Sequence, residues 1–177
     1  MNKRGFTLIE LLVVVLIIGI LASVAVPWYQ SAVDSSRYTQ LQVIVKSIKD
    51  AVELSRMMTG SYPATLENLD IELPSNCTLT GDKTVANCGK FFIDYMDGYS
   101  QNIVGMMNFD SNTFSAAGNY VAYVAWLDYA DANSGRRECR AGASSERMQK
   151  LCADQPGTLD GTAGGNHCPS CKRYWLN

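Results

Sequence analysis

The most apolar part of the chain is residues 6–26, a run that stops at Pro27 and, from residue 11 onward, contains one polar side chain, Ser23. A helix of about 20 apolar residues is long enough to cross the hydrocarbon core of a membrane. Glu10 lies inside this run, although an ionised carboxylate is costly in hydrocarbon. An acid retained at this place predicts that Glu10 meets a partner.

The flanking charges predict how this segment is oriented. Lys3 and Arg4 precede the apolar run, and no further basic residue occurs before Arg37. The positive-inside rule therefore predicts a cytoplasmic N-terminus, with the rest of the chain on the other side of the membrane. A cleaved signal peptide fits less well, because residues 22–24 and 25–27 are poor small-x-small cleavage sites and the helical pattern continues beyond them.

The helical pattern runs to about Met58, and Gly60 and Pro63 mark its end. Its second half carries one apolar stripe, formed by Leu41, Ile44, Val45, Ile48, Ala51 and Val52. We therefore expect an amphipathic half that covers a globular domain. Gly19 and Pro27 are predicted points of flexibility, since Gly lowers helix propensity by about 1 kcal/mol and Pro removes a hydrogen bond.

After the helix, the pattern changes to short apolar runs separated by Gly, Asn, Asp and Ser. Residues 90–96, 103–109 and 120–129 are predicted strands, with turns at residues 97–98 and 117–119. We expect a small antiparallel sheet packed on the amphipathic half of the helix, because each has one apolar face.

The segment from residue 133 to residue 177 is polar and rich in Gly and Cys. Within it we expect a short helical turn at residues 146–152, a loop at 158–165, and an edge strand or docked tail at 173–176. The predicted fold class is α+β: a long N-terminal helix packed on a small antiparallel sheet, with a disulfide-stapled C-terminal region.

Six cysteines occur in the chain, all after residue 76. An even number beyond a membrane-targeting segment predicts disulfides formed in an oxidising compartment. Six cysteines allow 15 connectivities, and pairing of sequence neighbours is the leading hypothesis. That hypothesis gives Cys77–Cys88, Cys139–Cys152 and Cys168–Cys171.

Two motifs allow a chemical interpretation besides the structural one. The Cys168–Cys171 pair beside His167 has the spacing of a redox motif or of half a zinc site, but it lacks a β-α-β context and a second ligand pair. Asp128, Asp131 and Asn133 alternate like calcium ligands, but no bidentate Glu completes the loop, and such residues also form turns. We expect no cofactor and a structural protein rather than an enzyme.

The charge balance is mild, with 15 Lys and Arg against 17 Asp and Glu. A nucleic-acid interface would need clustered basic residues, so no nucleic-acid partner is predicted.

Residues 3–11, Lys-Arg-Gly-Phe-Thr-Leu-Ile-Glu-Leu, resemble the prepilin cleavage and N-methylation motif of type IV pilins and type II secretion pseudopilins, and the resemblance extends to residue 30. It implies that prepilin peptidase cuts between Gly5 and Phe6 and methylates the new amino group of Phe6. It also implies that Glu10 neutralises the Phe6 amino terminus of a neighbouring subunit in a filament.

The resemblance implies five regions: a leader at residues 1–5, a membrane and filament-core helix at 6–27, an amphipathic helix at 28–59, a loop and sheet at 60–138, and a Cys-rich region at 139–177. The expected function is that of a structural subunit of a type IV pilus-like filament. Its precursor would span the inner membrane, and the filament would be periplasmic or on the cell surface. The expected partners are copies of itself, prepilin peptidase and an inner-membrane assembly platform. A pseudopilin, a minor tip pilin and a membrane-tethered binding domain are the alternatives.

Overall fold

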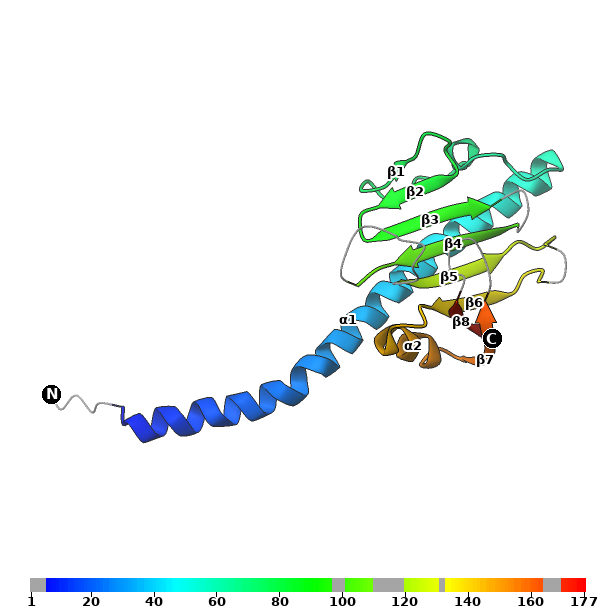
Figure 1. The fold of residues 1–177 in the computed structure, drawn as a ribbon. Helices are drawn as coiled ribbons and strands as arrows, with labels where there is room; N and C mark the ends of the chain where they lie inside the picture. Colours follow the sequence, from blue (N-terminus) through cyan, green and yellow to red (C-terminus); the bar gives the residue numbers. More distant parts are fainter. Residues whose placement is uncertain (1–5, 97–100, 110–119, 131–132, 164–169) are drawn as a thin grey trace. The chain divides into compact units, whose positions relative to one another are not determined.

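The computed structural model describes residues 6–96, 101–109, 120–130, 133–163 and 170–177 (Figure 1). The elements are α1 (Leu8–Thr59), the 3-10 helix η1 (Leu66–Asn68), β1 (Thr78–Leu79), β2 (Val85–Cys88), β3 (Phe91–Met96), β4 (Asn102–Met107), β5 (Val121–Trp126), β6 (Arg137–Ala141), α2 (Glu146–Ala153), β7 (Gly157–Ala163) and β8 (Cys171–Leu176). The chain forms two compact units, Met1–Ser36 and Arg37–Asn177, which we describe separately.

The unit Met1–Ser36 is helical from Leu8 onward and contains Pro27 within the helix. Among the described residues, α1 is the one helix that is long and apolar enough to cross a membrane, judged by length and composition. Its polar Ser23 hydroxyl donates to the Ile20 carbonyl oxygen at 2.7 Å, so this group is satisfied within the helix.

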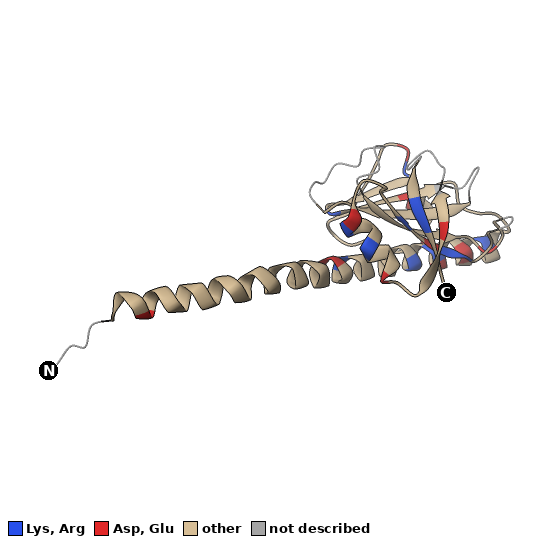
Figure 2. Ribbon diagram, turned by 60° about the horizontal axis from the view of Figure 1, so that its bottom comes forward, with Lys and Arg blue, Asp and Glu red and all other residues tan. Residues whose placement is uncertain are grey.

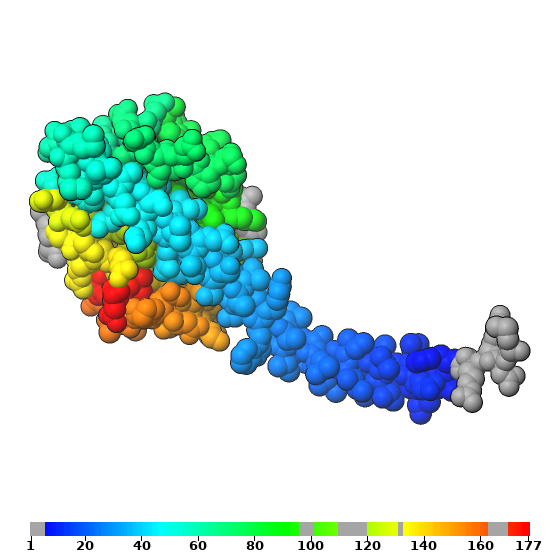
Figure 3. Space-filling model, turned by 180° about the vertical axis from the view of Figure 1, so that it is seen from behind, coloured from blue at the N-terminus to red at the C-terminus, as the bar shows by residue number. Residues whose placement is uncertain are grey.

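The unit Arg37–Asn177 is built on one eight-stranded sheet with the order β1-β2-β3-β4-β5-β6-β8-β7. All neighbouring strands are antiparallel. The second half of α1 lies across one face of this sheet, between its green N-terminal strands and its yellow to red C-terminal part (Figure 3). The α+β class expected from the sequence is confirmed.

The sheet is larger than the sequence pattern predicted. The expected loop at residues 158–165 is wrong over its first part, because Gly157–Ala163 forms strand β7. The segment expected at the edge or as a docked tail instead lies inside the sheet, since β8 pairs with β6 on one side and β7 on the other. The expected turns at 97–98 and 117–119 lie outside the described residues.

The core lies between α1 and the sheet. Five α1 side chains are fully buried there, and they are Tyr38, Leu41, Val45, Ile48 and Val52. Four of the five belong to the predicted apolar stripe. Tyr38 was not predicted, and its ring meets that of Tyr123 edge-on, with centroids 6.2 Å apart. Burial raises the pKa of the Tyr38 hydroxyl, which keeps this core residue neutral.

A second apolar cluster is formed by strand residues that alternate with those facing α1. Val104 and Met106 belong to it, whereas Ile103 and Met107 belong to the core under α1. Because successive side chains of a strand point to opposite faces, the second cluster lies on the face of the sheet away from α1.

Two disulfides tie down the irregular parts of the sheet. Cys77–Cys88 joins the segment before β1 to the end of β2. Cys139–Cys152 joins β6 to α2, and both of its cysteines are buried. Both are pairs expected from the sequence. The third expected pair stays a prediction, because Cys168 lies outside the described residues.

Gly105 on β4 sets how closely the sheet approaches α1. A Cβ at this position would lie 2.4 Å from Val45 Cγ2 and 2.8 Å from Leu41 Cδ1. Gly105→Ala should therefore lower the free energy of unfolding by about 1–3 kcal/mol, because the stiff Val45 side chain has to move. Urea unfolding of the detergent-solubilised chain, followed by tryptophan fluorescence, measures this. Gly81→Ala is the matched control, since a Cβ there meets nothing within 4 Å. Equal unfolding midpoints for the two variants would contradict the explanation.

Candidate assembly site

The first turn of α1 forms a hydrogen-bonded ring between Thr7 and Glu10. The Thr7 backbone N–H and hydroxyl donate to Glu10 Oε2 at 2.8 and 2.5 Å. The Glu10 backbone N–H donates back to Thr7 Oγ1 at 3.3 Å. Since α1 begins at Leu8, Thr7 is the N-cap and Glu10 is the third helical residue, which is the geometry of a capping box.

The capping box was not predicted from the sequence, although its signature of Thr followed by Glu three residues later is present. It places the Glu10 carboxylate at the positive end of the helix dipole. No Lys or Arg side chain pairs with Glu10 in the part of the chain that the structure describes. Within this part of the chain, the contacts to the Glu10 side chain come from Thr7.

The N-terminal part of α1, from residue 8 to residue 26, exposes its large apolar side chains in the single chain. The exposed fractions of its large apolar residues range from 45% at Val13 to 81% at Leu8. Phe6, the expected mature N-terminus, is 73% exposed. A surface of this size and composition requires cover by lipid or by other helices.

Within the described residues, the structure gives no contact that explains Gly5, Gly19 or Pro27, the other residues predicted to matter in this segment. Gly5 lies outside the described residues. Gly19 and Pro27 both lie inside α1, and a Cβ at Gly19 would meet nothing within 4 Å. No packing against the described residues therefore demands a glycine at Gly19, and the flexibility of Gly19 and Pro27 stays a prediction.

The calcium candidate Asp128 has partners within the domain. Its Oδ1 accepts from Lys49 Nζ at 2.6 Å, and its backbone N–H donates to Glu53 Oε1 at 2.6 Å. Glu53 also accepts from the Tyr62 hydroxyl at 3.1 Å. Burial, with the Glu53 carboxylate beside the ring, raises the pKa of Tyr62 to about 12. These contacts hold the segment after β5 against α1.

This arrangement uses Asp128 as a structural anchor, with Lys49 as its cation. Within the described residues, no group of three His, Cys, Asp or Glu side chains is placed to hold a metal ion. Asp131 lies outside those residues, so a calcium site formed by Asp128, Asp131 and Asn133 stays a prediction. His167, beside the Cys168–Cys171 motif, also lies outside them.

Comparison with known proteins adds to this geometry. Residues 1–26 match the model of the prokaryotic N-terminal methylation motif. The chain is 39% identical over 69 residues to the type II secretion system core protein G of Pseudomonas aeruginosa, covering 39% of this chain and 49% of that protein. It is 37% identical over 82 residues to the type IV major alpha-pilin of Moraxella bovis, covering 46% of this chain and 50% of that protein.

A fimbrial protein of Pseudomonas aeruginosa is 47% identical over 69 residues, which cover 39% of each chain. The chain thus spans half or less of the length of these relatives, and no solved structure matches it. The motif and the relatives together support the type IV pilin and type II secretion pseudopilin family. None of the three relatives carries the name of an enzyme.

Proposed function

We propose that the chain is a structural subunit of a type IV pilus-like filament. The observation that carries the proposal is the Glu10 carboxylate, which accepts from Thr7 at the start of an exposed apolar helix and has no Lys or Arg partner among the described residues. The match of residues 1–26 to an N-terminal methylation motif supports the same conclusion.

Processing creates a cation with which Glu10 can pair. Prepilin peptidase cuts between Gly5 and Phe6 at the cytoplasmic face of the inner membrane, where residues 1–5 lie before processing. The cut frees the amino group of Phe6, which is then methylated and stays positively charged. Glycine suits the cleaved position because it has no side chain to exclude from the peptidase.

Assembly then pairs the Phe6 amino group with Glu10 of a neighbouring subunit. In the membrane, burial of apolar helices against one another gains no hydrophobic free energy over lipid, so close packing and polar contacts must select the register. Two opposite charges that are costly alone in an apolar bundle become tolerable when paired. The helices form the filament core, and the unit Arg37–Asn177 forms its surface.

A type II secretion pseudopilin is the second candidate function, and the similarity to core protein G favours it. The disulfides favour a filament that leaves the cell, because covalent ties within each subunit resist unfolding outside it. A minor, tip-located pilin is a further variant of the same proposal.

The proposal is tested on the organism that makes the chain. Filaments sheared from the cell surface are examined by electron microscopy, and their main subunit is sequenced by mass spectrometry. We expect a subunit that begins with N-methylated Phe6. Absence of surface filaments together with a secretion defect on gene deletion would indicate the pseudopilin. An unprocessed chain in the membrane would indicate a tethered binding domain.

A further inference from the structure

The two edges of the sheet carry opposite charge. Residues 60–96, which contain β1 to β3, have five Asp and Glu against two Lys. Residues 133–177, which contain β6, α2, β7 and β8, have seven Lys and Arg against four Asp and Glu. Because β1 and β7 are the two edges of the sheet, these two segments lie at opposite ends of its strand order. Figure 2 marks the charged residues on the ribbon, with Lys and Arg in blue and Asp and Glu in red.

The acidic edge presents a short segment, residues 67–72, which contains Glu67, Asp70 and Glu72, all exposed. Glu67 lies 3.4 Å from Lys83 Nζ in its own chain. Asp70 and Glu72 form no ion pair with any described residue. We call residues 67–72 the acidic segment.

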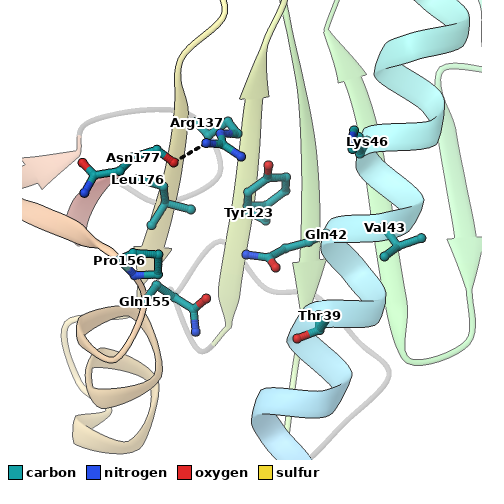
Figure 4. A pocket seen from close by; sticks show the side chains of 10 residues that line it. All are labelled: Thr39, Gln42, Val43, Lys46, Tyr123, Arg137, Gln155, Pro156, Leu176 and Asn177. Carbon is teal, nitrogen blue, oxygen red and sulfur yellow. Dashed lines mark hydrogen bonds between the residues drawn. The ribbon is translucent and has the colours of Figure 1, made fainter.

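The basic edge contains a cavity of about 280 Å³ between α1, β5, β6 and the chain that enters β7 (Figure 4). Lys46 and Arg137 line it together with Gln42 and Gln155, and none of its lining side chains is a carboxylate. We call this cavity the basic groove. Arg137 is held in place because it donates to the Asn177 backbone oxygen.

Lys46 is exposed and has no ion-pair partner among the described residues. On the same edge, α2 contributes the exposed Lys150 in its last turn. Lys46 in the basic groove and Lys150 on α2 are therefore exposed positive charges without an ion pair among the described residues.

We propose that the basic groove receives the acidic segment of a second copy of this chain. The inference rests on the proposed filament and adds a contact between its globular surfaces. Opposite charges at opposite edges favour a head-to-tail contact, which extends into an open polymer when its rotation does not close. An edge-to-edge two-fold contact would place each edge against itself and bring like charges together, which disfavours that contact.

Charge reversal in the full-length chain tests the contact. Lys46→Glu with Lys150→Glu, and separately Asp70→Lys with Glu72→Lys, should each reduce sheared filaments at least about tenfold. The chain that carries all four substitutions has complementary edges again, and its filaments should recover. Lys90→Glu is the control, because this exposed lysine lies outside the basic groove and the acidic segment, and it should leave the filament yield unchanged.

Membrane levels and formation of both described disulfides verify that each variant folds. Should a reversal fail to accumulate, Lys46→Gln with Lys150→Gln should still give a severalfold loss. The contact is wrong if the reversed pairs assemble like the original chain, or if the fourfold variant stays as poor as the reversed pairs, which is also the outcome expected for an unrelated acidic partner. Filaments of the unaltered chain that begin with N-methylated Phe6 would still support the proposed function.

Discussion

Replacing Gly5 with leucine is expected to leave the full-length chain unprocessed in the membrane and to abolish its filaments. The substitution puts a bulky side chain at the bond that must enter the peptidase. Without the cut, the amino group of Phe6 stays in a peptide bond and offers no charge to Glu10. Immunoblots of membrane fractions report the size of the chain, and electron microscopy of sheared material reports filaments.

Gly19→Leu is the matched control for this experiment. It makes the same change in side chain within the apolar helix, where a Cβ meets nothing within 4 Å of its own chain. Leucine also raises helix propensity by about 1 kcal/mol over glycine. We therefore expect normal processing of Gly19→Leu. Normal processing and normal activity of the Gly5→Leu chain would favour a membrane-tethered domain over a filament subunit.

The parts of the fold that the sequence predicted well are those with a strong local period. The apolar run and the stripe that follows it predicted a helix from residue 6 to about residue 58, and the structure has Leu8–Thr59. Three predicted strands correspond to β3, β4 and β5, and their ends differ from the predicted bounds by at most three residues. In these elements every residue contributes to one periodic pattern, so a single sequence is sufficient.

The strands that were missed are polar, and their stability depends on residues distant in sequence. Strand β6 contains Glu138, which is fully buried. Arg140 Nε donates to Glu138 Oε1 at 2.8 Å, and Arg173 Nε on β8 lies 3.8 Å from the other carboxylate oxygen. Burial of a carboxylate is costly unless cationic partners such as these surround it. Because Arg173 is distant in sequence from Glu138, the local sequence pattern of β6 does not predict this pairing.

The pairing of β7 with β8 also depends on polar contacts between residues distant in sequence. Asp160 accepts hydrogen bonds from Trp175 Nε1 and Arg173, both at 2.6 Å. These bonds hold the pKa of the Asp160 carboxyl below its usual range. From the sequence alone, Gly161 and the small polar residues around it were typical of a loop. Whether residues 157–163 form a strand or a loop depends on their contacts with β8, which form only when the chain folds back on itself.

The candidate assembly site was likewise only partly predictable from the sequence. The anomaly of Glu10 was evident from the sequence, because an acid in an apolar run is rare and costly. Its local partner Thr7 was equally readable as a capping box, but it became clear only with the hydrogen bonds in place. The second partner that we propose, a freed amino group on another subunit, would belong to an assembly and cannot follow from one chain.

The capping box is a second role for Glu10 beside the proposed charge pairing, and two substitutions distinguish the two roles. Glu10→Val removes both the acceptor for the Thr7 N–H and the negative charge. Glu10→Gln removes the charge but keeps an amide oxygen at the same position, and glutamine is as acceptable as glutamate in a capping box. If pairing with the Phe6 amino group is the function of Glu10, both variants should lose filaments severely while the processed chain accumulates in the membrane.

Retention in the membrane is expected because either change lowers the cost of placing this residue in hydrocarbon. Filament yield and the mass of the N-terminal peptide are measured together, so that a processing defect is separated from an assembly defect. If Glu10→Gln forms filaments as well as the original chain and Glu10→Val does not, the residue acts through the helix cap alone. The charge pairing between subunits would then be wrong, and helix packing alone would have to set the register.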